Sequence, residues 1–219
     1  MALQKETEKK LSKIYQFLTE KGEQDIAKLV TEIIRAECKT KRSTHFNMYD
    51  YSDQKRGIKC LEGVLYAGGK QVVTDSHQIL VLNEKYDEEL EGKLIGKNGE
   101  EIDARFPNYN AVLPKSLDGY EAHEIDAEKF YSWVDERRAA YQVDNMGKKT
   151  SWSDEWYVKI GHCLFKAYRF HLLIKAAKQL ESLTLYTVDA EQGAVVQSEK
   201  GIYMGMPWLT TNSEDVLQL

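Results

Sequence analysis

The chain has 219 residues, of which 42% are hydrophobic and 30% are charged, and its formal net charge is −5. This length allows one large domain or two small ones with a real core. The acidic charge argues against a protein that coats nucleic acid with its whole surface, although it leaves room for a local basic stripe. No apolar run approaches the ~20 residues that a membrane span needs, and the N-terminus lacks an apolar signal core, so we expect a cytoplasmic protein with no membrane partner.

Two amphipathic helices are predicted near the N-terminus. Residues 4–20 carry leucine, isoleucine and tyrosine at helical spacing, and Lys21-Gly22 is a typical helix end. Residues 24–39 form a cleaner apolar stripe with charged residues on the other face. The three cysteines are widely spaced and include no CxxC pair, so we expect buried thiols rather than a disulfide framework or a zinc site.

Three segments rich in β-branched and aromatic residues then predict strands. They are residues 44–51, 58–67 and 70–83, and the last two are separated by Gly68-Gly69, a strong hairpin turn. Residues 84–101 are acidic and punctuated by glycine, which indicates a surface excursion with one short hairpin at Gly96–Gly99.

The second part of the chain begins with ARFPNYNAVLPKS, residues 104–116, which holds two of the three prolines. Proline restrains the residue before it to extended geometry, so we expect an extended segment that crosses between two halves. The elements that follow are a strand at 120–125, a helix at 127–141, a strand at 156–165, a helix at 166–180, a strand at 183–189, a strand at 194–209 that is broken near Lys200-Gly201, and a loose polar tail. The whole pattern predicts an α+β fold with antiparallel sheets and helices packed on one face.

The segment VVTDSHQILVL, residues 72–82, has a polar centre inside an apolar run. A nucleophilic site would use Ser76 or a cysteine, with Asp75, His77 and His162 as partners. Ser76 and His77 are adjacent, however, and would point to opposite faces of a strand, and no GxSxG elbow occurs. A polar turn closed by its own hydrogen bonds is the preferred interpretation, and a hydrolase that uses Asp75 and His77 is the alternative.

Motifs for cofactors do not stand out in the sequence. The five histidines are scattered and form no HExxH or HxH pair, so we expect no metal site. No Walker loop occurs, and no GxGxxG follows a strand and opens a helix, so we expect no nucleotide cofactor. The chain is therefore predicted not to be an enzyme.

Basic residues recur on three of the predicted helices. His171, Lys175 and Lys178 form one stripe of the helix at 166–180, with Lys166 and Arg169 nearer its boundary. Such residues can contact phosphates without reading sequence, and a solvated helix face is the alternative. The complete set of candidate DNA-facing residues is Lys28, Arg35, Arg137, Arg138, Lys166, Arg169, His171, Lys175 and Lys178.

Three segments together resemble the bacterial DNA polymerase III β subunit, the sliding clamp. VVTDSHQILVL is similar to the family's ATDGHRLAV strand, RFPNYNAVLPKS to its RFPDYRRVLPK segment, and YMGMPWL to its closing YVVMPMRL. The helix at 166–180 and the strands around it also match the order of the family's helix-strand unit. The resemblance covers residues of about 58–209 and implies a DNA-clamp-like fold.

What the resemblance implies is a processivity factor that encircles or tracks duplex DNA and binds peptides of DNA polymerases and clamp loaders. The chain is much shorter than a three-domain clamp, so a ring of six clamp domains would require several copies, which implies a homo-oligomer. Residues 1–113, with an extra N-terminal helix, and 114–219 would be two clamp-like halves, or the chain would pack as one composite domain. The alternative is an adaptor or decoy of clamp fold that forms no ring and binds a polymerase peptide.

The resemblance also implies a peptide-binding cleft built from the three segments. Ser76 and Gln78 stand where the family has glycine and arginine, and Ala111 and Leu209 also replace arginines, which should alter the peptides that are tolerated. The tail, residues 211–219, is either disordered or a peptide that occupies the cleft. The residues carried over to the cleft are Thr74, Ser76, His77, Gln78, Ile79, Pro107, Val112, Met206, Pro207 and Trp208.

Overall fold

A computed structural model describes residues 5–23, 26, 29–30, 33, 45–144 and 152–219. The chain forms two compact units. We call residues 1–43 and 127–156 the helical unit, and residues 44–126 and 157–219 the sheet unit. Among the described helices, none combines the length and the apolar character that crossing a membrane would take.

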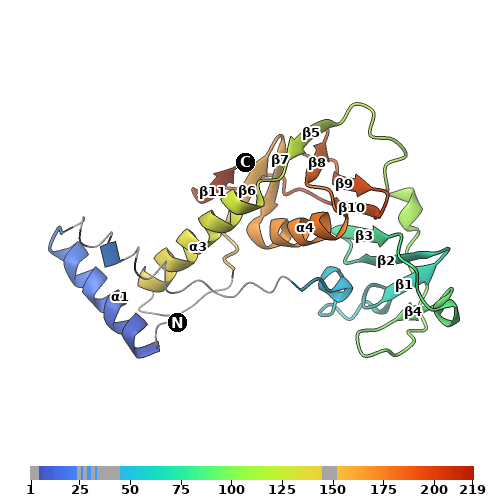
Figure 1. Ribbon diagram of the computed structural model, residues 1–219, viewed down its shortest axis with the longest axis horizontal. Coiled ribbons are helices and arrows are strands. Elements are labelled where there is room, and N and C mark those ends of the chain that lie inside the picture. The colour runs from blue at the N-terminus through green and yellow to red at the C-terminus, as the bar shows by residue number, and fades with distance from the viewer. Residues whose placement is uncertain (1–4, 24–25, 27–28, 31–32, 34–44, 145–151) are drawn as a thin grey trace. The chain divides into compact units, whose positions relative to one another are not determined.

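The helical unit contains α1 (Lys5–Glu20) and α3 (Ala127–Asp144), shown in Figure 1. α1 ends as its sequence predicts: Gly22 has φ +77°, the Gly22 N–H donates to the Thr19 carbonyl and the Glu23 N–H donates to the Leu18 carbonyl. This is the Schellman motif, which satisfies the last carbonyls of a helix. The apolar residues that pack together in this unit are Leu11, Tyr15, Leu18, Val30 and Ala139.

The sheet unit contains eleven strands and one long helix among the described residues. The strands are β1 (Val64–Ala67), β2 (Lys70–Thr74), β3 (Gln78–Leu82), β4 (Leu94–Ile95), β5 (Glu121–Glu124), β6 (Tyr157–Ile160), β7 (Cys163–Lys166), β8 (Thr184–Thr187), β9 (Ala194–Ser198), β10 (Gly201–Gly205) and β11 (Val216–Gln218). The helix is α4 (Ala167–Gln179), and the short 3-10 helices are η1 (Met48–Tyr51), η2 (Lys59–Leu61), η3 (Glu88–Leu90) and η4 (Tyr109–Ala111).

Eight strands form an antiparallel sheet in the order β4-β1-β2-β3-β10-β9-β8-β5. β3 lies in the middle and is buried at every position, which the apolar run ILVL after Gln78 favours. β10 pairs with β3 from Gly201↔Leu82 to Gly205↔Gln78, so the sheet joins strands from before and after residue 114. The predicted antiparallel α+β fold is confirmed, whereas the division into clamp-like halves at residue 113 stays a prediction.

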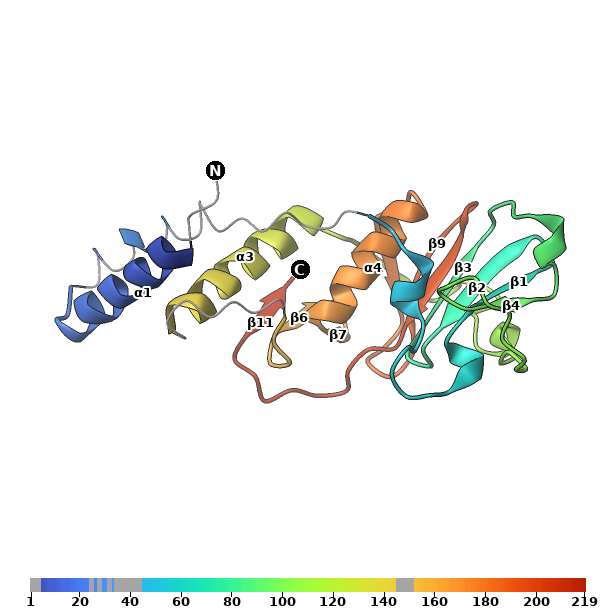
Figure 2. The ribbon, with the colours of Figure 1, turned by 90° about the horizontal axis from the view of Figure 1, so that it is seen from below.

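α4 packs on β10, β6 and β7 through an almost wholly apolar surface. The buried alanines of α4 allow the helix to approach the strands closely. The buried side chains of Phe170, Leu172, Leu173 and Ile174 fill the space around it. η1 holds the helix from another side, because the Tyr51 hydroxyl donates to the Leu172 carbonyl at 2.9 Å. Figure 2 shows the segment that carries η1 lying against α4.

Four of the expected elements are different in the structure. Residues 44–51, expected to be a strand, contain η1, whose N-cap Asn47 accepts a hydrogen bond from the Tyr49 N–H. Residues 70–83 form two strands with a tight turn between them, and the expected strand at 156–165 is the β6–β7 hairpin. The predicted loose tail ends in β11, which pairs in parallel with β6.

Candidate functional site

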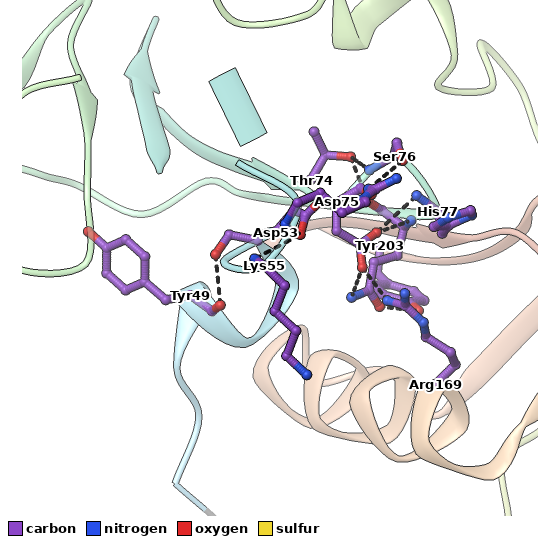
Figure 3. Close-up of polar contacts among 12 residues, drawn as sticks. Tyr49, Asp53, Lys55, Thr74, Asp75, Ser76, His77, Arg169 and Tyr203 are labelled. Carbon is purple, nitrogen blue, oxygen red and sulfur yellow. Dashed lines mark hydrogen bonds and ion pairs between the residues drawn. The ribbon is translucent and has the colours of Figure 1, made fainter. Parts of the chain in front are cut away.

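The turn between β2 and β3 is closed by the side chains of Thr74 and Asp75. The Thr74 hydroxyl donates to the Gln78 carbonyl (2.7 Å) and accepts from the Ser76 N–H (3.1 Å), while Asp75 Oδ1 accepts from the N–H groups of His77 (2.9 Å) and Gln78 (3.0 Å). Figure 3 shows these contacts. The predicted polar turn with internal hydrogen bonds is confirmed. Ser76 has φ +73°, the left-handed conformation that favours glycine, which explains why the similar family motif has glycine there.

Asp75 is buried and its charge is balanced from α4. Asp75 Oδ2 forms an ion pair with the Arg169 guanidinium, which reaches the turn from the helix in Figure 3, and accepts from Gln78 Nε2 at 3.2 Å. Gln78 Oε1 in turn accepts from the Tyr203 hydroxyl at 3.2 Å, and burial raises the pKa of this hydroxyl far above its usual range, so it stays a donor. The buried carboxylate is therefore fully occupied in fixing the turn.

A second carboxylate, Asp53, supports the same turn from outside the strands. It accepts from the N–H groups of Lys55 and Arg56 and forms an ion pair with Arg56 Nε. Burial alone would raise the pKa of Asp53, but these hydrogen bonds outweigh it and hold the pKa below its usual value. Arg56 Nη2 then donates to the Asp75 carbonyl (2.6 Å) and to the Ser76 hydroxyl (3.0 Å).

An apolar cluster extends from this turn across the sheet. Val72, Ile79 and Val81 form its buried base. The expected crossing segment folds onto the base through η4, so that Phe106, Tyr109 and Leu113 pack there together with Leu65, Ile202 and Met204. Pro107 and Val112 of this segment stay at the surface, and 58% of Val112 is exposed.

Residues 206–208 connect the two sheets. The Met206 N–H donates to the His77 carbonyl on the turn at 2.8 Å, and the Trp208 N–H donates to the Leu164 carbonyl of β7 at 2.5 Å. The Met206 and Trp208 side chains are 44% and 47% exposed, and Lys166 Nζ lies 4.7 Å from the centre of the Trp208 ring. Exposed apolar side chains held by backbone bonds on both sides are typical of a binding surface.

The structure thus brings most predicted cleft residues together. Thr74, Ser76, His77, Gln78 and Ile79 share one turn and strand, and Met206 is bonded directly to that turn. Pro207 and Trp208 follow in the chain, and Pro107 and Val112 belong to the segment packed on the same apolar base. Their role in binding a peptide stays a prediction.

The predicted DNA-facing residues have varied surroundings. Lys28 and Arg35 lie outside the described residues. On α3, Arg137 and Arg138 lie over the rings of Trp133 and Trp152. On α4, Lys175 forms an ion pair with Asp50 at 2.8 Å and is only 10% exposed, and Arg169 pairs with Asp75. Lys166, the last residue of β7, lies over Trp208. His171 is half-buried and Lys178 is exposed, and contact with DNA stays a prediction for the whole set.

The sequence did not indicate that Asp75 and Arg169 form a pair. The buried acid in an apolar run signals that some cation must approach, but Arg169 lies 94 residues further along the chain. The hydrolase alternative gains no geometric support, because Asp75 meets the backbone N–H of His77 and not its exposed ring. In the described part of the chain, no three His, Cys, Asp or Glu side chains converge as metal ligands would.

No protein-family model matches the sequence, and no curated protein matches it. The structure does resemble solved sliding clamps. One is the clamp (DNA polymerase III subunit β) of Bartonella birtlesii bound to griselimycin, with 16% identity and a TM-score of 0.52 over 73% of this chain and 61% of that one. The sliding clamp of Caulobacter crescentus has 16% identity and a TM-score of 0.51 over 81% and 63% of the two chains.

The β clamp of Helicobacter pylori bound to a DNA ligase peptide has 14% identity and a TM-score of 0.50, over 74% of this chain and 61% of that one. These similarities confirm the clamp-like fold that the three motifs predict. The chain spans less than two thirds of the length of the clamps it matches.

Proposed function

Because its fold is that of the bacterial sliding clamps, we propose that this chain is a clamp-like processivity factor of a DNA polymerase. In this proposal it tracks or encircles duplex DNA without reading its sequence, associates with further copies of itself, and binds short peptides of a DNA polymerase and a clamp loader. It acts by binding alone and catalyses no reaction.

One observation carries the peptide part of the proposal. The β2–β3 turn and strand β3 contact two segments that are far apart in the sequence: the segment around η4 packs on the cluster that contains Ile79, and the Met206 N–H donates to the His77 carbonyl. Around these contacts Val112, Met206 and Trp208 expose apolar side chains, which suits an extended peptide with leucine or phenylalanine anchors. That the similar Helicobacter pylori clamp was solved with a DNA ligase peptide supports this choice of ligand.

The DNA part rests on the clamp-like fold and on the basic residues of α3 and α4. Phosphate contacts from lysine and arginine are independent of sequence and allow sliding. Lys178 is exposed, and no acidic residue lies on α4 between Ala167 and Gln179. An acidic protein with a local basic helix face would hold DNA on that face and repel it elsewhere.

The peptide part is tested by selecting a displayed library of random peptides on the immobilised full chain and measuring the best binders by fluorescence polarisation. Met206→Ala and Trp208→Ala should each weaken binding roughly tenfold, because they remove exposed anchors of the surface. Leu183→Ala is the matched control, since Leu183 is 42% exposed and lies beside β8. Failure to enrich any peptide, or equal losses in all three variants, would contradict the proposal.

The DNA part is tested by light scattering at tens of micromolar and by retention on circular plasmid. A ring made of several copies should stay on a closed circle and slide off after the plasmid is linearised. A strict monomer that is retained equally on circular and linear plasmid contradicts encirclement.

A second candidate function is an adaptor of clamp fold that binds a polymerase peptide without forming a ring. One observation favours it: Arg169 and Lys175 of α4 are already engaged by Asp75 and Asp50. A monomer that binds the selected peptides with full affinity would establish this candidate over the first.

A further inference from the structure

Arg56 presents a guanidinium that is fixed on one side and open on the other. Nε is paired with the buried carboxylate of Asp53, and Nη2 donates to the Asp75 carbonyl and the Ser76 hydroxyl. The side chain is nevertheless 46% exposed, and among the described residues no acceptor bonds to Nη1. A guanidinium carries five N–H donors, so both donors of Nη1 remain for a ligand.

The Arg56 guanidinium lies at the edge of the proposed peptide-binding surface. It bonds directly to Ser76, the neighbour of exposed His77, and the His77 carbonyl holds Met206. A peptide whose apolar side chain lies against Met206 would therefore have its neighbouring residues within reach of Arg56.

We propose that Arg56 is a specificity-determining residue of this site and selects peptides that carry a carboxylate next to their apolar anchor. The inference rests on the proposed peptide-binding function. Because Asp53 and the turn already fix three of the five donors, little side-chain freedom is lost when a carboxylate binds. A hydrogen bond from the charged guanidinium to a carboxylate is also stronger than one to a neutral acceptor.

A peptide is favoured over DNA as the source of the anion. The Asp53 carboxylate neutralises much of the Arg56 charge, and Asp75 adds a second buried carboxylate at the same turn. A duplex, with its dense row of phosphates, favours clusters of uncompensated cations, whereas a single carboxylate needs only well-placed donors.

The inference is tested by parallel selections of one random peptide library on the wild-type chain, Arg56→Gln and Arg56→Lys. Aspartate and glutamate should be enriched beside the apolar anchors of the wild-type pool, and this enrichment should disappear with Arg56→Gln and weaken with Arg56→Lys. Lys55→Gln is the matched control, because Lys55 is the exposed neighbouring cation and its own selection should keep the enrichment.

The winning peptide is then synthesised with an amidated terminus in its acidic form and with Asn or Gln in place of the acid. The wild type should bind the acidic form roughly three- to tenfold more tightly, and Arg56→Gln should bind both forms equally. The acidic peptide is also made with a free C-terminal carboxylate; tighter binding that appears only with this form assigns the contact to the terminal carboxylate and overturns the inference. The ratio between two peptides does not depend on how much the variant disturbs the turn, and circular dichroism checks that it folds.

Three further results would overturn the inference. If the peptides selected on the wild type carry apolar anchors but no enriched aspartate or glutamate, the peptide site is supported and the role of Arg56 is refuted. A preference for acid that persists in Arg56→Gln assigns recognition to another residue. A variant that binds a short DNA duplex more weakly, with the peptide preference intact, makes Arg56 a phosphate contact. Failure of the wild type to enrich any peptide is a different result, which refutes the proposed function itself.

Discussion

Replacing Asp75 with asparagine should show how much the β2–β3 turn depends on a charge from α4. Asparagine keeps an oxygen for the N–H groups of His77 and Gln78 but places an amide where Oδ2 meets Arg169. Removing one partner of a buried ion pair costs about 3–5 kcal/mol, and because Arg169 is 33% exposed we expect about 2 kcal/mol here. That loss corresponds to a fall in melting temperature of roughly 4–8 °C for a chain of this size.

The assay is urea unfolding of the wild type, Asp75→Asn, Arg169→Gln and the double variant. If the ion pair is the cause, the double variant should lose less than the sum of the two single losses, with a coupling of about 1–2 kcal/mol. Glu181→Gln is the control, because Glu181 pairs with Lys200 while 69% exposed and should change stability by less than about 0.5 kcal/mol. Additive losses, or an Asp75→Asn loss no larger than the control, would refute the reasoning.

Three further predictions concern Cys163, Ser76 and the last strand, β11. Burial, assisted by Asp189, raises the pKa of the Cys163 thiol from 9.0 to about 11, so this thiol stays protonated when folded but ionises above pH 9 when unfolded. The free energy of unfolding should therefore fall by up to about 2–3 kcal/mol between pH 9 and 11 relative to Cys163→Ala, as followed by denaturant titration. Ser76→Gly should be about 1 kcal/mol more stable than Ser76→Ala in thermal unfolding, because φ is +73°; equal stabilities would contradict this. Removal of residues 214–219 should uncover the edge of β6 and increase light scattering on concentration, which an unchanged monomer profile would disprove.

Features set by neighbouring residues were predictable from the sequence. The end of α1 at Gly22, the hairpin at Gly68-Gly69 and the polar turn at Thr74–Gln78 each depend on local conformational preference or on side chains within a few positions. The clamp-like fold was predictable for a different reason, since three motifs together resemble segments of one known family and so carry information about a whole fold.

Features set by distant residues were not predictable. The residues of 44–51 are as suitable for a strand as for η1, and what decides between them is the bond from Tyr51 to Leu172 on α4. Any of the 30 lysines and arginines could have balanced Asp75, so the sequence alone does not single out Arg169 as its partner. The parallel pairing of β11 also had no signal, because three residues of mixed character do not specify a partner.

The β6–β7 hairpin is held from both sides by one later stretch of the chain: Trp208 pairs with β7, and β11 pairs with β6. Sequence order therefore imposes a timing on folding. When residues 157–166 leave the ribosome, both edges of this hairpin still lack their partners, and they must wait until residues 208–218 have been synthesised. The sheet would then be completed last, and a pause in translation ahead of residue 208 would prolong the interval in which these edges can pair with other chains.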